Sequence, residues 1–170
     1  MVHDLSGDAF VDRVNTIRGS QRSFLLSPTQ WRTYSMQQQL SWQFVKFEEA
    51  NRVSVPDQRG VYAFVVRHDN GYFPPHGYIM YIGNTGAGES LNTLRARYGD
   101  YIQERKRNKR PAVHFMLNAY KDDLFFFFVP FADCNIDLDK IEEALNDAIV
   151  PPVNKKDFSA ELRSVMGAMS

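Results

Sequence analysis

Apolar residues in the N-terminal third of the chain recur at helical spacing. Across residues 6–18 they return every three or four positions, which predicts a helix there. Ser27 followed by Pro28 is typical of a helix start, because a hydroxyl can cap the first turn and a proline ring fits its first position. We expect this second helix to end near Leu40. The stretch 42–47 is compatible with either a strand or a helix.

From residue 60 onward, short apolar runs alternate with helical stripes. The pattern predicts strands at 60–66, 77–83 and 124–131 and helices at 91–108, 138–149 and 157–169. The first two strands should form a hairpin with a long loop, since Asn70-Gly71 and Pro74-Pro75 lie between them. The third strand is apolar on both faces, so we expect it to be central. These elements predict a mixed α/β (α+β) domain at residues 56–170 behind an N-terminal helical extension at residues 1–55.

Composition narrows the class of protein. The 170 residues include 20 Lys and Arg against 20 Asp and Glu, and this zero net charge excludes binding of nucleic acid through bulk charge alone. The one cysteine, Cys134, excludes an internal disulfide and a thiolate metal cage. The sequence has no apolar run of about 18 residues, and its first ten residues are too polar for a signal peptide. We therefore expect a soluble, cytoplasmic protein with no membrane partner.

The charges are nevertheless unevenly distributed. Residues 95–110 carry seven Lys or Arg and two acidic residues, a local balance of plus five. This stretch is a candidate phosphate-facing surface, and the alternative is a solvated helix face followed by a basic loop. The residues that we assign to nucleic-acid binding are Arg105, Lys106, Arg107, Lys109 and Arg110. The four histidines, by contrast, show no metal-ligand spacing.

Two short segments on the predicted hairpin resemble the signature of the GIY-YIG nuclease family. They are Gly60-Val61-Tyr62 on one strand and Tyr81-Ile82-Gly83 on the next. The resemblance continues in the family's order with Leu94, Arg97 and Tyr101 on the following helix, and then with Glu142, Pro151 and Asn154. Twelve residues separate the glutamate from the asparagine. The similarity spans residues 60–154 and leaves the first 55 residues outside it.

The resemblance implies a fold, an activity and a cofactor. The fold would be a small, three-stranded, mostly antiparallel sheet flanked by helices. The activity would be that of an endonuclease that hydrolyses DNA phosphodiester bonds with Mg²⁺ (or Mn²⁺) bound. A site that cuts one strand needs a homodimer, or two successive nicks, to cut a duplex. The implied catalytic residues are Tyr62, Tyr81, Arg97, Tyr101, Glu142 and Asn154, and the implied metal ligand is Glu142.

Each implied residue suits a part of phosphodiester hydrolysis. Arg97 offers a planar positive fork to the scissile phosphate. Tyr62 is our general base, and Tyr81 positions the phosphate or the water. A free tyrosine has a pKa of about 10. For Tyr62 to act as a base at neutral pH, either neighbouring positive charge must lower its pKa or Tyr62 must hand its proton on to another group. Tyr101, four residues after Arg97 on a helix, should lie over it, and Asn154 should orient neighbouring groups through its amide.

The metal ligand is chosen between two adjacent glutamates. Stepping about 100° per residue from Leu138 places Glu142 at the edge of the apolar stripe of its helix and Glu143 on the polar face. A carboxylate against apolar neighbours is costly unless a cation or hydrogen bonds compensate, and Glu143 carries no such cost. This argument and the spacing to Asn154 both select Glu142.

Two departures from the family pattern leave other functions open. Asn84 stands where relatives often carry Lys, and the 19-residue gap between the two motif tyrosines enlarges the hairpin loop. One alternative is a catalytically inactive GIY-YIG-derived module that binds nucleic acid or a protein partner. Another is a structural subunit that contacts a partner through Trp31, Tyr34 and Trp42, although core packing is the commoner role of such residues.

Overall fold

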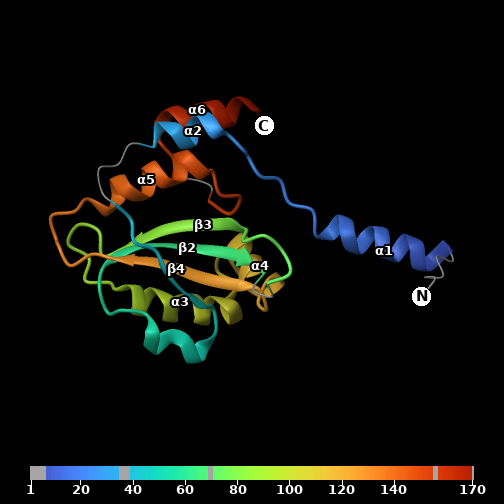
Figure 1. The fold of residues 1–170 in the computed structure, drawn as a ribbon, viewed down its shortest axis with the longest axis horizontal. Helices are drawn as coiled ribbons and strands as arrows, with labels where there is room; N and C mark the ends of the chain where they lie inside the picture. Colours follow the sequence, from blue (N-terminus) through green and yellow to red (C-terminus); the bar gives the residue numbers. More distant parts are fainter. Residues whose placement is uncertain (1–6, 35–38, 69–70, 155–156, 170) are drawn as a thin grey trace.

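The computed structural model describes residues 7–34, 39–68, 71–154 and 157–169. The elements in chain order are α1 (Gly7–Gly19), α2 (Pro28–Thr33), β1 (Gln43–Lys46), the 3₁₀ helix η1 (Glu49–Ser54), β2 (Gly60–Arg67), β3 (Gly77–Thr85), α3 (Leu94–Arg107), α4 (Pro111–Ala119), β4 (Leu124–Pro130), α5 (Leu138–Ile149) and α6 (Ala160–Met169). Figure 1 shows one sheet between helices, with α1 standing apart, so the mixed α/β fold is confirmed. Among the described residues, no helix combines the length and apolar character needed to cross a bilayer.

The sheet has four antiparallel strands in the order β1-β4-β2-β3, rather than the three that we predicted. The additional strand is β1, from the ambiguous stretch 42–47, and it pairs with residues 125–128 of β4. β4 is buried over most of its length, so unpaired main-chain groups along either of its edges would be costly. Its central position is as predicted. The segment assigned to the N-terminal extension thus contributes one strand to the sheet.

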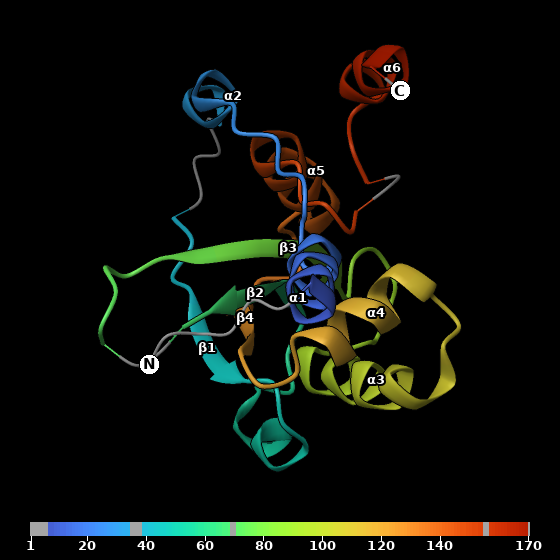
Figure 2. The same cartoon turned by 90° about the vertical axis from the view of Figure 1, so that its right-hand side faces the viewer.

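The two faces of the sheet pack against different helices (Figure 1 and Figure 2). Because side chains alternate along a strand, Tyr62 and Phe64 of β2 point to the face covered by α3 and α4. There they join the largest core cluster, together with Tyr98 and Phe126. α5 covers part of the opposite face, where it packs against the alternate β2 residues Val61, Ala63 and Val65.

Most predicted helices and strands agree with the structure, and besides β1 and the 3₁₀ helix η1 the differences concern α2 and α4. The second helix begins at Pro28 with Ser27 as its cap, as predicted, but it ends at Thr33 and not near Leu40. Helix α4 has no counterpart among the predictions, although Pro111 fits the first turn of a helix. This short helix closes the basic loop that follows α3.

Two aromatic residues predicted for the core lie at the surface. Trp31 is 45% exposed and Trp42 is 36% exposed, so core packing is the wrong prediction for both. Trp31 belongs to a helix of six residues, which has a narrow buried face, and Trp42 precedes the edge strand β1. Tyr34 is half-buried.

Candidate active site

Three tyrosines that are far apart in the sequence converge between the sheet and α3. Tyr62 comes from β2, Tyr81 from β3 and Tyr101 from α3. Their ring centroids lie 5.8, 6.2 and 6.3 Å apart in pairs. The hydroxyl oxygens of Tyr62 and Tyr101 share a hydrogen bond of 2.9 Å. Tyr62 and Tyr101 are buried and Tyr81 is half-buried, so Tyr81 is the member of the cluster that reaches solvent.

The strand register and one glycine make room for this cluster. Tyr62 of β2 lies directly opposite Gly83 of β3. A Cβ at position 83 would lie 2.5 Å from the Tyr62 hydroxyl oxygen and 2.7 Å from its Cζ, closer than real atoms pack. Position 83 therefore requires glycine for reasons of space. An irregularity in the β2–β3 ladder then places both Met80 and Tyr81 against the core cluster of Tyr62.

Two arginines border the tyrosine cluster. Arg97 on α3 has a buried Nε without a hydrogen-bond partner among the described residues. Arg110, from the turn between α3 and α4, places its Cζ 4.8 Å from the ring centroid of Tyr101. The cation over Tyr101 is thus Arg110, where we predicted Arg97. Arg95, the other arginine of the first turns of α3, is directed elsewhere, since its Nε donates to the Val55 carbonyl at 2.8 Å.

Burial dominates the protonation of these phenols. It raises the pKa of Tyr62 well above its usual value, with further contributions from Tyr101 and Tyr81, and the opposing effect of Arg97 is smaller. Burial also raises the pKa of Tyr81, followed by Tyr101 and by carboxylates that include Glu142. Tyr62 and Tyr81 are therefore neutral phenols at neutral pH. The positive neighbour that we required is present, but burial prevails over it.

Glu142 on α5 contacts the end of β3 through Asn84. The Asn84 Nδ2 donates to Glu142 Oε2 at 2.5 Å and to Asp139 Oδ1 at 2.8 Å, so one amide joins two carboxylates of α5. The pKa of Glu142 is raised to about 7, first by burial and then by Asp157 and Asp139, against an opposing effect of Asn84. Asn84, which directly follows the Tyr81-Ile82-Gly83 motif, thus contacts both of these α5 carboxylates.

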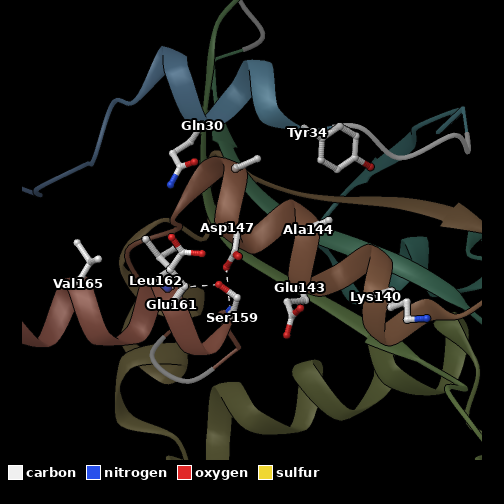
Figure 3. A pocket seen from close by; sticks show the side chains of 11 residues that line it. Gln30, Tyr34, Lys140, Glu143, Ala144, Asp147, Ser159, Glu161, Leu162 and Val165 are labelled. Carbon is white, nitrogen blue, oxygen red and sulfur yellow. Dashed lines mark hydrogen bonds between the residues drawn. The ribbon is translucent and has the colours of Figure 1, made fainter.

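The adjacent Glu143 lies on another side of the helix. It is exposed whereas Glu142 is half-buried, so the helical register predicted for this pair is confirmed. Glu143 lines a cavity of about 540 Å³ between α2, α5 and α6, together with Asp147 and Glu161 (Figure 3). The Ser159 N–H donates to Asp147 there at 2.9 Å. None of the predicted site residues lines this cavity, which separates it from the tyrosine cluster.

Asn154 joins the segment after α5 to the edge of the sheet. Its buried side chain accepts the Ile82 N–H at 2.9 Å and donates to the Ile82 carbonyl at 2.8 Å. The same amide donates to Asp157 Oδ2 at 3.0 Å. Asn154 thus fixes β3 next to Tyr81, and it orients Asp157, whose charge raises the pKa of both Tyr81 and Glu142.

Sequence reasoning missed several of these neighbours. Asp139 precedes Glu142 by three residues on one helix, a spacing that pairs side chains and could have been used. Asn84 was noted as a departure, without a partner. Nothing in the local sequence marks Asp157 or brings Arg110 to the tyrosines, because both side chains follow turns.

The predicted basic cluster does not form one uniform surface. Arg110 lies over Tyr101, and Arg105 places its Cζ 5.9 Å from the ring centroid of Phe47. The buried carboxylate of Glu104 accepts the Arg110 N–H at 2.7 Å and so holds the turn. The exposed cations of the cluster that stack on none of these rings are Lys106, Arg107 and Lys109.

The donor set near Glu142 suits a magnesium ion held mostly by water. The described residues contain no group of three or more His, Cys, Asp or Glu side chains placed to hold a metal ion. Mg²⁺ keeps several waters and is commonly bound through one or two carboxylates, so it does not need such a group. The half-buried Glu142, with Asp139 and Asp157 nearby, carries a raised pKa that a bound cation would relieve.

The chain was also compared with known proteins. No protein-family model, curated protein or solved structure matches it. Its function is therefore inferred below from the arrangement of its own side chains.

Proposed function

We propose that the protein is a metal-dependent endonuclease that hydrolyses DNA phosphodiester bonds through a GIY-YIG-type site. The observation that carries the proposal is the convergence of residues that the motifs selected from four separate elements. Tyr62, Tyr81 and Tyr101 form one cluster, Arg97 borders it, and Glu142 is electrostatically coupled to Tyr81. Packing of one helix on one sheet would not by itself gather these residue types.

The fourth strand does not affect this proposal. The proposed site is built on β2 and β3, whereas β1 lies at the opposite edge of the sheet, beyond β4. The proposed likeness to the GIY-YIG fold therefore concerns β2, β3, β4 and the helices that pack on them.

In the proposed reaction, Arg97 binds the scissile phosphate. Its guanidinium presents paired donors in a plane, and its side chain is partly exposed beside Asp100, whose Oδ2 lies 3.6 Å from the Arg97 Nη1, so a bound phosphate would take the place of this weak ion pair. Tyr81 reaches solvent and positions the attacking water or a phosphate oxygen. Glu142 would hold Mg²⁺ or Mn²⁺, which when bound supplies Lewis-acid stabilisation of the negative charge on the phosphate and the leaving oxygen.

The proton of the attacking water follows the hydrogen bond between Tyr62 and Tyr101. A neutral phenol can accept a proton only if it hands its own proton on, and the Tyr101 hydroxyl lies 2.9 Å from that of Tyr62. Tyr101 in turn passes its proton to Tyr81, to which its side chain is hydrogen-bonded, and Tyr81 releases its own proton to solvent. Arg110, stacked on the Tyr101 ring, adds positive charge beside this pair. Of the two routes that we considered for Tyr62, the raised pKa favours transfer along the pair over a phenolate.

Direct assay tests the proposal. The full chain is incubated with single-stranded, duplex and branched DNA, with and without Mg²⁺. We expect cleavage that needs the metal, is lost in Glu142→Gln and is retained in Glu143→Gln, since the second glutamate faces a separate cavity. Absence of cleavage of all three substrates by folded protein, with Mg²⁺ and with Mn²⁺, contradicts the proposal.

One observation favours the alternative, a GIY-YIG-derived module that binds nucleic acid or a protein partner without cutting. The Asn84 amide donates to Glu142, and burial keeps Tyr62 and Tyr81 protonated. A module of this kind would bind DNA in the same assay and leave it intact. Cleavage that Glu142→Gln abolishes excludes it.

A further inference from the structure

A row of five rings lies at the loop end of the β2–β3 hairpin, outside the proposed site. Along the row Phe24, Tyr78, His76, Phe73 and His68 have successive ring centroids 5.1, 6.0, 6.3 and 5.5 Å apart. Tyr78 is 51% exposed and Phe73 is 56% exposed. Rings this exposed contribute little to the core, so the row calls for another explanation.

Two hollows flank Tyr78 in this row. Their volumes are about 410 Å³ and 260 Å³, and both are lined by Tyr78 and Val66. Each hollow contains one arginine and at least two further rings. The lining includes Arg22, Phe24 and Tyr120 in the larger hollow and Arg67, His68 and His76 in the smaller one. The surface therefore repeats one combination, a guanidinium with flat rings, on both sides of a shared tyrosine.

The arginines of both hollows are held in place by aromatic rings. The Cζ of Arg22 lies 4.7 Å from the ring centroid of Phe115, and the Cζ of Arg67 lies 4.8 Å from that of Phe44. One carboxylate, Asp123, lines the smaller hollow. Two fixed guanidinium groups thus outnumber the single acid, and the pair of hollows favours an anionic ligand that carries flat groups.

The hollows lie close to the tyrosine cluster along β3. Met80 lines the larger hollow and directly precedes Tyr81. Tyr78 and Tyr81 are three residues apart on one strand, a separation of about 10 Å at roughly 3.3 Å per residue. A strand of nucleic acid bound at Tyr81 could therefore extend into both hollows.

We propose that these hollows bind successive unpaired nucleotides of the DNA strand next to the scissile phosphate. The bases stack on Tyr78 and on the rings beside it, and Arg22 and Arg67 face the phosphates. This inference rests on the proposed function, because it assumes that the ligand is DNA. Stacking on a side chain needs a base whose face is free, and duplex bases cover each other's faces. The hollows accordingly select single-stranded or locally unpaired DNA over duplex DNA.

Binding in EDTA tests this inference independently of cleavage. The affinity of a fluorescently labelled oligothymidine and of a labelled duplex is measured by anisotropy for the full chain, Tyr78→Ala and Tyr78→Phe. We expect Tyr78→Ala to weaken single-strand binding roughly ten- to hundredfold, the usual range for loss of one base–aromatic stack. Tyr78→Phe keeps the ring and should bind within about twofold of the parent. Duplex affinity should be the same for all three proteins.

Folding is checked by circular dichroism and thermal unfolding. A second variant, His76→Ala, removes the ring beside Tyr78 in the smaller hollow and should weaken single-strand binding in the same direction. The inference is overturned if Tyr78→Ala binds single strands as tightly as the parent. It is also overturned if the parent does not bind single strands, even if the row of rings then proves to contact a protein or peptide. Glu143→Gln, which alters the separate cavity between α2, α5 and α6, is the matched control and should bind the oligothymidine in EDTA like the parent. If no DNA is ever cut but Tyr78→Ala still weakens single-strand binding, the endonuclease proposal fails and this one stands. If DNA is cut and Tyr78→Ala binds and cuts like the parent, only this one fails.

Discussion

The carboxyl of Glu142 makes protein stability depend on pH in a way that can be calculated. Its pKa is raised from 4.5 to about 7, first by burial and then by Asp157 and Asp139. The folded state therefore binds this proton more tightly than the unfolded chain, so the stabilisation is fully present below about pH 4.5 and is lost as the pH rises to about 7. At about 1.4 kcal/mol per pH unit the full difference is about 3 kcal/mol. Because Glu142 is only half-buried, solvent screening reduces the expected loss to about 1–2 kcal/mol.

Urea unfolding of the metal-free protein at pH 5 and pH 8 measures this loss. Between these pH values the parent and Glu143→Gln should each lose about 1–2 kcal/mol more of the free energy of unfolding than Glu142→Gln. Histidines and other titrating groups are common to all three proteins, so the difference isolates Glu142. Mg²⁺ added at pH 8 should stabilise the parent and leave Glu142→Gln unchanged. An equal pH dependence in the parent and Glu142→Gln would refute the buried environment assigned to this carboxyl.

Three further changes test the site at other points. Arg97→Lys keeps the charge but loses the planar fork, so DNA cleavage should fall roughly 100-fold with little loss of DNA binding. Arg95→Lys is the control and should cut normally, because the Arg95 side chain donates a hydrogen bond to a backbone carbonyl. Gly83→Ala forces a Cβ against the buried Tyr62 and should reduce the free energy of unfolding by about 1–3 kcal/mol, while Gly19→Ala, with no atom within 4 Å of the new Cβ, should change it by less than about 0.5 kcal/mol. The third change neutralises the exposed cations Lys106, Arg107 and Lys109 together. The slope of log affinity for DNA against log salt concentration should then become shallower by roughly 0.9 per lost phosphate contact, and an unchanged slope would identify these residues as solvated charges.

Local sequence predicted the elements that carry long apolar runs and failed where pairing or packing decides. β2, β3 and β4 are seven to nine residues long and were placed within about two residues. β1 has four residues and becomes a strand by pairing with β4, which a local pattern does not specify. The end of α2 was misplaced for the same reason. The helix propensities of residues 34–40 do not exclude a helix, and tertiary packing, which supplies most helical stability, decides where the helix ends.

The same distinction applies to the candidate site. Tyr62, Tyr81 and Tyr101 were predicted together through the motifs. The positions of Tyr62 and Tyr101 follow from a strand and a helical repeat, which are regular, whereas Tyr81 reaches the same cluster through the irregularity in the β2–β3 ladder, which local sequence does not specify. Arg110 and Asp157 were not placed, because each follows a turn whose conformation sets the direction of the side chain. Those turns are held by side chains from elsewhere in the fold: Glu104 accepts the Arg110 N–H, and Asn154 donates to Asp157.

The balance of burial and charge at the tyrosines limits which chemistry the proposed enzyme can use. Tyr62 is 2% exposed and Tyr101 is fully buried, so bulk water reaches neither hydroxyl. Arg97 lowers the pKa of Tyr62, but burial raises it by more. A phosphate bound at Arg97 would offset this positive charge and favour the neutral phenol still further. A phenolate that forms before the substrate binds is therefore disfavoured. The proton of the attacking water has to pass along the hydroxyls from Tyr62 to Tyr101 and on to Tyr81, which reaches solvent and releases a proton there. The positive charges of Arg97 and Arg110 stabilise the negative charge that develops beside them.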